Sequence, residues 1–292
     1  MTLALIPGAD PWSHEGGRWG ALCIHGFTGN PGAMRGVAEA FALAGFSVEL
    51  PRLPGHGTTV EDMMTTGFAD WTGEAEAAYQ RLASRTDKVV VAGLSMGGTL
   101  TLWTAAEHPE VAAIVCINPA TQPQADEIVD MVRGMVDEGE ELIAGIGSDI
   151  ADPEVTETAY AGTPLRPLLS LVEGLGALGP RYPSITCPLL LMNSPQDHVV
   201  EPVQSDYLAE HFGGPVERIT LERSYHVATL DYDRDLVESS AVAFAQRILG
   251  SAAPVRERAQ ERAQRVPTDR APANRVAMGS GGAAPVQERV QE

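Results

Sequence analysis

The sequence predicts an α/β fold in which helices flank a mostly parallel central sheet. Short apolar, β-branched runs alternate with amphipathic stretches along most of the chain, as strands joined by crossover helices do. A glycine-flanked serine, Ser95 in the run GLSMG at 93–97, stands where such a strand meets a helix. The chain has 292 residues, of which 44% are hydrophobic, so one domain can bury a substantial core.

The first part of the chain follows this alternation closely. Helix 33–44 places Val37 and Phe41 on one face, and Asp70 stands at the start of helix 70–84 as its predicted cap. The predicted elements in order are strand 20–25, helix 33–44, strand 46–50, helix 70–84, strand 88–92, helix 98–107 and strand 112–117.

The alternation stops between residues 118 and 183, where no strand-like run is evident. This stretch is too long for a simple connection, and it holds two helical pieces, 127–136 and 168–178. We interpret it as a cap over the active site, inserted into a core of residues 1–117 and 184–250. The later predicted elements are strand 188–193, helix 202–212, strand 216–221 and helix 233–249.

Residues 251–292 differ in composition from the rest. They are rich in Arg, Glu, Gln, Pro and Ala and have no aromatic residue, so we expect a disordered tail. A helical docking segment at 256–265 is the alternative. The net charge of −19 argues against a nucleic-acid partner, because phosphate binding needs a basic face.

Composition also bears on location and on metals. Three cysteines (Cys23, Cys116 and Cys187) form neither a disulfide framework nor a metal-ligand spacing, and we expect buried thiols in a reducing compartment. The N-terminus shows no basic segment ahead of an apolar stretch. Residues 89–106 lack charge but contain several glycines and threonines, so we interpret them as buried strand and helix and expect a cytoplasmic protein without a transmembrane segment.

The run around Ser95 has the pattern G-x-S-x-G of a nucleophile elbow. There a sharp strand-to-helix turn exposes the serine, and glycines flank it because the strained turn leaves no room for Cβ atoms. A serine nucleophile needs a base and an acid that orients the base, which in this arrangement follow the serine along the chain. Asp197 and His226 each come shortly after a predicted strand and are the expected acid and base.

Competing residues exist for both roles. Glu201 is an alternative acid, and His198 and His211 are alternative bases. His211 lies on a predicted helix, where a solvated side chain is the simpler interpretation, and His198 directly follows the expected acid, which makes the required geometry awkward.

The oxyanion hole needs two backbone N–H groups. Met96, which follows the serine and opens a helix, is one expected donor, and Phe27 in the early loop 25–29 is the other. The Phe27 ring is also expected to border the acyl pocket. For His25 and His56 in their turns, we favour structural roles over proton transfer.

Five segments together resemble bacterial monoacylglycerol lipases and closely related carboxylesterases of the α/β-hydrolase superfamily. They are HGFTGNP (25–31), LPGHG (53–57), GLSMGG (93–98), DHVV (197–200) and SYHVATLDYD (224–233). The resemblance runs from about residue 22 to 249. It implies an α/β-hydrolase fold with a helical cap inserted after the sixth strand, no cofactor, and hydrolysis of a small-molecule lipid ester. Residues 126–141 are more acidic than a lipid-facing lid would be, so we expect at most transient contact with lipid surfaces.

The resemblance implies Ser95, Asp197 and His226 as the triad and Phe27 and Met96 as oxyanion donors. Segments 145–150 and 157–160 also resemble the family's cap, in which Glu157 matches a carboxylate that faces the glycerol headgroup, with a solvated helix-face glutamate as the alternative. Three alternative functions remain: a short-chain carboxylesterase, an acyl thioesterase or acyltransferase with the same triad, and a catalytically silent receptor. The last predicts a missing triad member, and none is missing.

Overall fold

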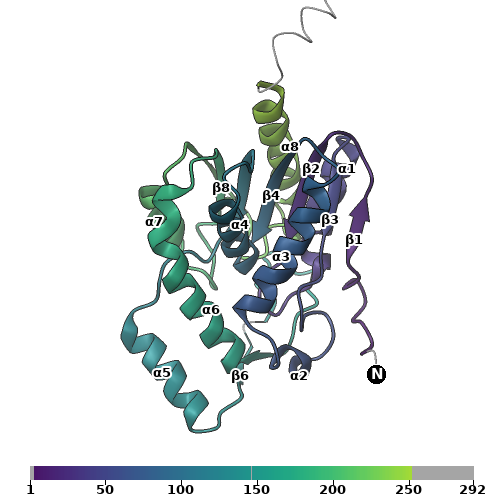
Figure 1. The fold of residues 1–292 in the computed structure, drawn as a ribbon. Coiled ribbons are helices and arrows are strands. Elements are labelled where there is room, and N and C mark those ends of the chain that lie inside the picture. Colours follow the sequence, from purple (N-terminus) through teal and green to yellow (C-terminus); the bar gives the residue numbers. More distant parts are fainter. Residues whose placement is uncertain (1–2, 146, 252–292) are drawn as a thin grey trace, which may run out of the picture. The chain divides into compact units, whose positions relative to one another are not determined.

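The computed structural model, which describes residues 3–145 and 147–251, contains a seven-stranded sheet (Figure 1). In spatial order its strands are β1 (Trp12–His14), β3 (Ser47–Leu50), β2 (Trp19–Ile24), β4 (Lys88–Leu94), β5 (Ala113–Ile117), β8 (Leu189–Asn193) and β9 (Val216–Thr220). Only β1 runs antiparallel to its neighbour in this sheet. The predicted α/β architecture with a mostly parallel sheet is therefore confirmed.

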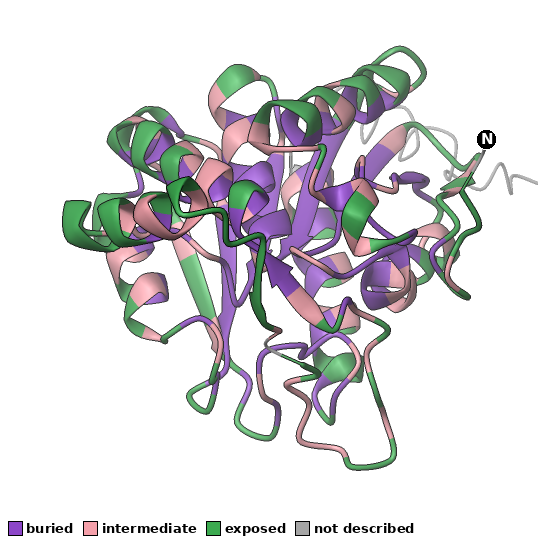
Figure 2. Cartoon of the chain, turned by 90° about the horizontal axis from the view of Figure 1, so that it is seen from below, coloured by how far each residue is buried: buried purple, intermediate pink, exposed green. Residues whose placement is uncertain are grey.

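The central strands are buried on both faces, which explains their continuous apolar sequences. In β4, Val89 and Val91 belong to one hydrophobic cluster, whereas Val90 and Ala92 belong to the other. The same alternation of side chains continues in the neighbouring strands. Figure 2 shows the strands as mostly buried ribbon, with the exposed surface on the outer sides of the helices.

Helices cover each face of the sheet. On one face lie α3 (Phe68–Ala83), α4 (Met96–Glu107) and α7 (Val203–His211), and on the other lie α1 (Arg35–Leu43) and α8 (Arg234–Ser251). Shorter helices are η1 (Pro31–Met34), α2 (Val60–Met63) and η2 (Gly179–Ser184). In the described residues, no helix is both long and apolar enough to cross a bilayer.

The β5–β8 segment, residues 118–188, carries α5 (Asp126–Asp137) and α6 (Leu165–Leu178), which pack against each other (Figure 1). It also contains two short antiparallel strands that the sequence did not reveal, β6 (Leu142–Ala144) and β7 (Gly162–Pro164). Strands of this length have no recognisable alternation, and their pairing depends on residues far apart in the chain.

Two further expectations need correction, and one lies outside the described region. The insertion follows the fifth strand rather than the sixth, because only the short strand β1 precedes β2. Gly67, not Asp70, is the N-cap residue of α3, and the Asp70 carboxylate accepts the Gly67 N–H from within the first turn at 2.9 Å. The predicted disorder of residues 251–292, and the alternative helix at 256–265, fall on residues beyond the described range, apart from Ser251.

Candidate active site

Ser95 occupies a strained turn between β4 and α4. Its backbone has φ 57° and ψ −121°, a positive φ that L-residues rarely adopt. A Cβ on Gly97 would overlap the Ile24 carbonyl, and a Cβ on Gly93 would overlap the Gly97 carbonyl. These close backbone approaches explain why glycine flanks the serine, as the sequence motif indicates.

His226 and Asp197 lie together at the same edge of the sheet, in loops that follow β9 and β8. His226 Nδ1 is 2.7 Å from Asp197 Oδ2, and both side chains are almost fully buried. Asp197 Oδ1 accepts the N–H groups of Val199 and Val200, each at 2.8 Å. This arrangement aims the carboxylate at the imidazole and leaves Nε2 as the nitrogen available to a reacting group.

The Ser95 hydroxyl makes no hydrogen bond within the described part of the chain. The hydrogen bond between a catalytic nucleophile and its base is often long or misaligned without substrate and tightens in the reacting complex. The lack of a Ser95–His226 hydrogen bond in this structure is therefore compatible with His226 as the base.

Two backbone N–H groups lie near Ser95 without a partner. Neither the Phe27 nor the Met96 N–H donates a hydrogen bond to another described residue. A Cβ placed on Gly26, the residue before Phe27, would lie 3.8 Å from the Ser95 hydroxyl oxygen. The Phe27 loop therefore packs directly against the serine, and both donors fit an oxyanion hole.

An apolar cavity of ≈ 250 Å³ opens beside Ser95, between the core and the β5–β8 segment. Its apolar walls come from the Phe27 loop, α5, α6 and the loop after β8, and they include Phe27, Ile128, Val132, Leu168, Leu171, Val172, Leu175, Val199 and Val200. A cavity of this character accommodates a hydrocarbon chain.

Glu157, on the β5–β8 segment, faces the same site. Its carboxylate oxygen lies 2.9 Å from the position of a Cβ on Gly29, in the early loop that carries Phe27. Burial raises the pKa of Glu157, and the electrostatic attraction of His226 partly opposes that rise. The structure thus brings a carboxylate from a distant segment close to the candidate base.

His25 and His56 each have a ring nitrogen in contact with a carbonyl of their own turn, at 3.0 Å. His25 Nε2 accepts the Leu53 N–H at 3.2 Å, and burial lowers the pKa of His25 well below its ordinary value. Burial lowers the pKa of His56 to about 4. Both rings are therefore neutral at pH 7 and buried in turns of the core.

Among the described residues, none of the competing acid and bases forms a hydrogen bond to the His226 or Asp197 side chain. His211 Nδ1 bonds to the Tyr207 carbonyl on its own helix at 2.8 Å, and Glu201 is exposed. His198 is mostly exposed, and its Nδ1 lies 2.8 Å from Asp149 Oδ1.

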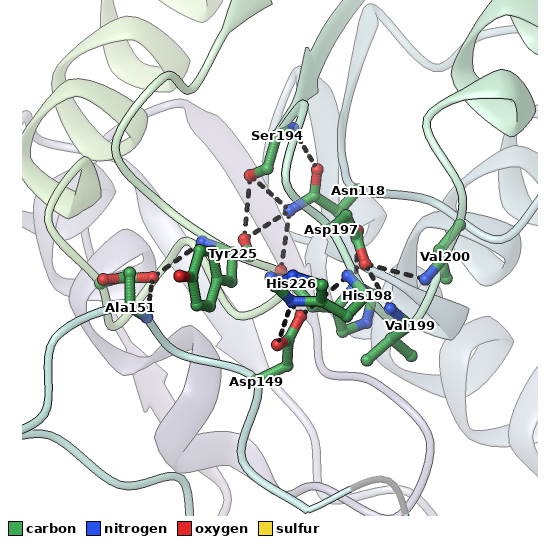
Figure 3. Close-up of polar contacts among 11 residues, drawn as sticks. Asn118, Asp149, Ala151, Ser194, Asp197, His198, Val199, Val200, Tyr225 and His226 are labelled. Atoms are coloured by element: carbon green, nitrogen blue, oxygen red, sulfur yellow. Dashed lines mark hydrogen bonds and ion pairs between the residues drawn. The ribbon is translucent and has the colours of Figure 1, made fainter.

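Asn118, at the end of β5, is a residue that sequence reasoning missed. Its amide nitrogen lies 2.8 Å from the His226 carbonyl oxygen and 3.2 Å from that of Tyr225, and its amide oxygen accepts the Ser194 N–H at 2.7 Å (Figure 3). It therefore joins the loops that carry Asp197 and His226. The signal available in the sequence was an asparagine directly after the predicted strand 112–117. The structure shows that this asparagine is buried.

Comparison with known proteins places this chain in a family. Residues 21–239 match the model described as "Alpha/beta hydrolase family". The chain belongs to the α/β hydrolase family. This α/β hydrolase is 42% identical, over 243 residues, to the thermostable monoacylglycerol lipase of Bacillus sp. (strain H-257), across 82% of this chain and 95% of that protein. It is 24% identical over 240 residues to a carboxylesterase of Bacillus subtilis (strain 168), across 82% and 96%.

Two solved structures of lipolytic enzymes are similar to this chain in fold. A structure from a study of LipS and LipT, two metagenome-derived lipolytic enzymes, matches with TM-score 0.79 and 40% identity over 84% of this chain and all of that one. The monoacylglycerol lipase of Paleococcus ferrophilus matches with TM-score 0.63 over 82% and 99%, and at 18% identity it supports the fold alone.

Proposed function

We propose that this α/β hydrolase is a serine ester hydrolase that cleaves monoacylglycerols into fatty acid and glycerol. The observation that carries the proposal is the position of Ser95 at the wall of an apolar cavity, near the N–H groups of Phe27 and Met96, which have no partner among the described residues. The 42% identity to a protein named a monoacylglycerol lipase supports the substrate class.

The mechanism follows from the residues at the site. Ser95 attacks the ester carbonyl while His226 accepts the hydroxyl proton, and Asp197 stabilises the resulting imidazolium. The N–H groups of Phe27 and Met96 hold the negative oxygen of the tetrahedral intermediate. His226 then protonates the leaving glycerol, and water activated by the same imidazole hydrolyses the acyl-enzyme at Ser95.

Glu157 is our candidate for headgroup recognition. A carboxylate accepts hydrogen bonds from hydroxyl groups, and a site built to bond a polyol disfavours an alkyl alcohol that leaves the carboxylate unpaired. Two observations support this role: the Glu157 carboxylate lies beside Gly29 in the loop that carries Phe27, and the charge of His226 influences the pKa of Glu157. The glycerol would leave the substrate beside His226.

We propose that residues 118–183 act as a cap whose helices α5 and α6 cover the acyl chain, over a core of residues 1–117 and 184–250. Val132 on α5 and Leu171 on α6 contribute to the cavity wall. The first turn of α5 carries Asp126 and Glu127, so contact with lipid surfaces is expected to be transient. The three cysteines are free thiols, which supports a reducing compartment such as the cytoplasm.

The test compares hydrolysis of monooleoylglycerol, a short p-nitrophenyl ester and an acyl thioester by the full chain. The proposal expects the highest kcat/KM for monooleoylglycerol and loss of all turnover in Ser95→Ala. A clear preference for the short ester would favour the second candidate, a carboxylesterase, which the relationship to the Bacillus subtilis protein supports. Turnover retained by Ser95→Ala would refute the nucleophile.

A further inference from the structure

Asp149, a residue of the β5–β8 segment, contacts both loops of the candidate triad. We call residues 194–200 the acid loop and residues 223–233 the histidine loop. Asp149 Oδ2 accepts the backbone N–H of His226 at 3.1 Å and that of His198 at 3.1 Å (Figure 3). The Asp149 carbonyl also accepts the Val227 N–H, at 3.1 Å.

Two properties make this contact stronger than a surface hydrogen bond. The Asp149 side chain is only 14% exposed, and hydrogen bonds to an ionised acceptor are stronger than those between neutral groups. The second carboxylate oxygen is occupied by His198 Nδ1 at 2.8 Å, so the orientation of the carboxylate is set from two sides.

The N–H that Asp149 holds belongs to His226 itself. The position of that backbone determines how far the imidazole lies from Asp197 and from the serine, and errors of about 1 Å in such distances lower rates by roughly 10²-fold. We propose that Asp149 is a positioning residue, which clamps the acid and histidine loops together so that His226 is aligned only when the β5–β8 segment is seated. This inference rests on the proposed function, because it assumes His226 as the base.

Neighbouring contacts join the same segment to the histidine loop. The Asp231 carboxylate accepts the N–H groups of Ala151 at 2.7 Å and Asp152 at 3.1 Å, and also that of Tyr225 at 2.9 Å. The residues after Asp149 are therefore attached to the loop that carries the base, independently of Asp149.

Asn118 makes the corresponding connection from the sheet. It bonds carbonyls of the histidine loop and the Ser194 N–H of the acid loop. The contacts of Asn118 and Asp231 remain when Asp149 is replaced. We therefore expect the replacement to affect kcat more strongly than the free energy of unfolding.

The experiment measures kcat and KM for a short p-nitrophenyl ester with the full chain and five variants, of which Ser95→Ala tests the nucleophile. Asp149→Ala should lower kcat by roughly 10- to 100-fold with little change in KM. Asp149→Asn should recover most of kcat, because its amide oxygen still accepts the His226 N–H. Asp149→Glu keeps the charge but displaces both oxygens, so it should lose kcat as Asp149→Ala does. Glu154→Ala, which removes an exposed carboxylate from the same segment, is the matched control and should behave as wild type.

Each result bears on the proposal. Wild-type kcat in Asp149→Ala, or in Asp149→Glu if the alanine variant does not fold, overturns it. Equal losses in Asp149→Ala and Asp149→Asn also overturn it, because the negative charge alone would then be the cause. Ser95→Ala distinguishes failure of the proposed function from failure of the positioning role. Turnover retained by Ser95→Ala refutes the proposed function. An inactive Ser95→Ala together with a fully active Asp149→Ala refutes only the positioning role of Asp149.

Discussion

The Nδ1 atom of His226 lies 2.7 Å from Oδ2 of Asp197, and the two side chains are 9% and 2% exposed. A buried carboxylate in this position fixes one tautomer of the imidazole and stabilises the imidazolium that forms during catalysis. The predictions below start from this pair.

Asp197→Asn should lower kcat by about 10⁴-fold with little loss of stability. The asparagine oxygen can still accept the N–H groups of Val199 and Val200, but its NH₂ group would face His226 and favour the wrong tautomer. Steady-state kinetics together with thermal unfolding test this. Glu201→Gln, in the exposed alternative acid, is the control, and a comparable loss there would reopen the choice of acid.

Gly97→Ala should destabilise the protein by roughly 1–3 kcal/mol or more, because the added Cβ would overlap the Ile24 carbonyl and force the backbone apart. Gly73→Ala is the matched control within helix α3, where a Cβ meets nothing within 4 Å. It should stabilise by about 0.5–1 kcal/mol. Urea unfolding measures both changes, and equal effects of the two variants would contradict the close packing at the turn.

Glu157→Gln should lower kcat/KM for a monoacylglycerol by roughly 10- to 100-fold relative to a simple alkyl ester, because a charged hydrogen-bond acceptor is lost. The wild-type preference for the monoacylglycerol over the alkyl ester should weaken as the pH falls and Glu157 becomes protonated. Because burial raises the pKa of Glu157, this weakening should begin at a higher pH than it would for an ordinary carboxyl group. The ratio of kcat/KM for the two substrates at each pH removes any change with pH that affects both esters equally. Equal losses on both esters would argue against headgroup recognition.

The two buried histidines should make the protein sensitive to acid. Burial lowers the pKa of His56 from 6.5 to about 4 and also lowers that of His25 well below its ordinary value. Below pH 6.5 the unfolded chain therefore binds protons that the folded chain does not. Their contribution to stability is therefore present above pH 6.5 and decreases as the pH falls, by up to roughly 1.4 kcal/mol per pH unit for each ring.

Urea unfolding at several pH values measures this decrease. His56→Gln should have a smaller loss between neutral and acidic pH than wild type, whatever its stability at pH 7. His211→Gln, in an exposed histidine, should keep the wild-type pH dependence. A His56→Gln curve parallel to that of wild type would show that this ring does not titrate on unfolding.

Local sequence was sufficient for much of the fold. The β-branched run of β4, the glycines around Ser95 and the helix after it each show their pattern within a short stretch of sequence, so the pattern predicts their local structure. The order of Ser95, Asp197 and His226, each after a strand, also predicted a common location, because the carboxyl ends of parallel strands meet at one edge of the sheet.

The tertiary structure alone decided the connections between these elements. Asn118 reaches the histidine loop across 108 positions of sequence, and Asp149 reaches the His226 N–H across 77. The pairing of β6 with β7 and the partnership of His198 with Asp149 likewise leave no periodic signal in the chain. Hydrogen bonds between distant segments depend on how the sheet and the inserted segment pack, and a single sequence records the residue types but not that packing.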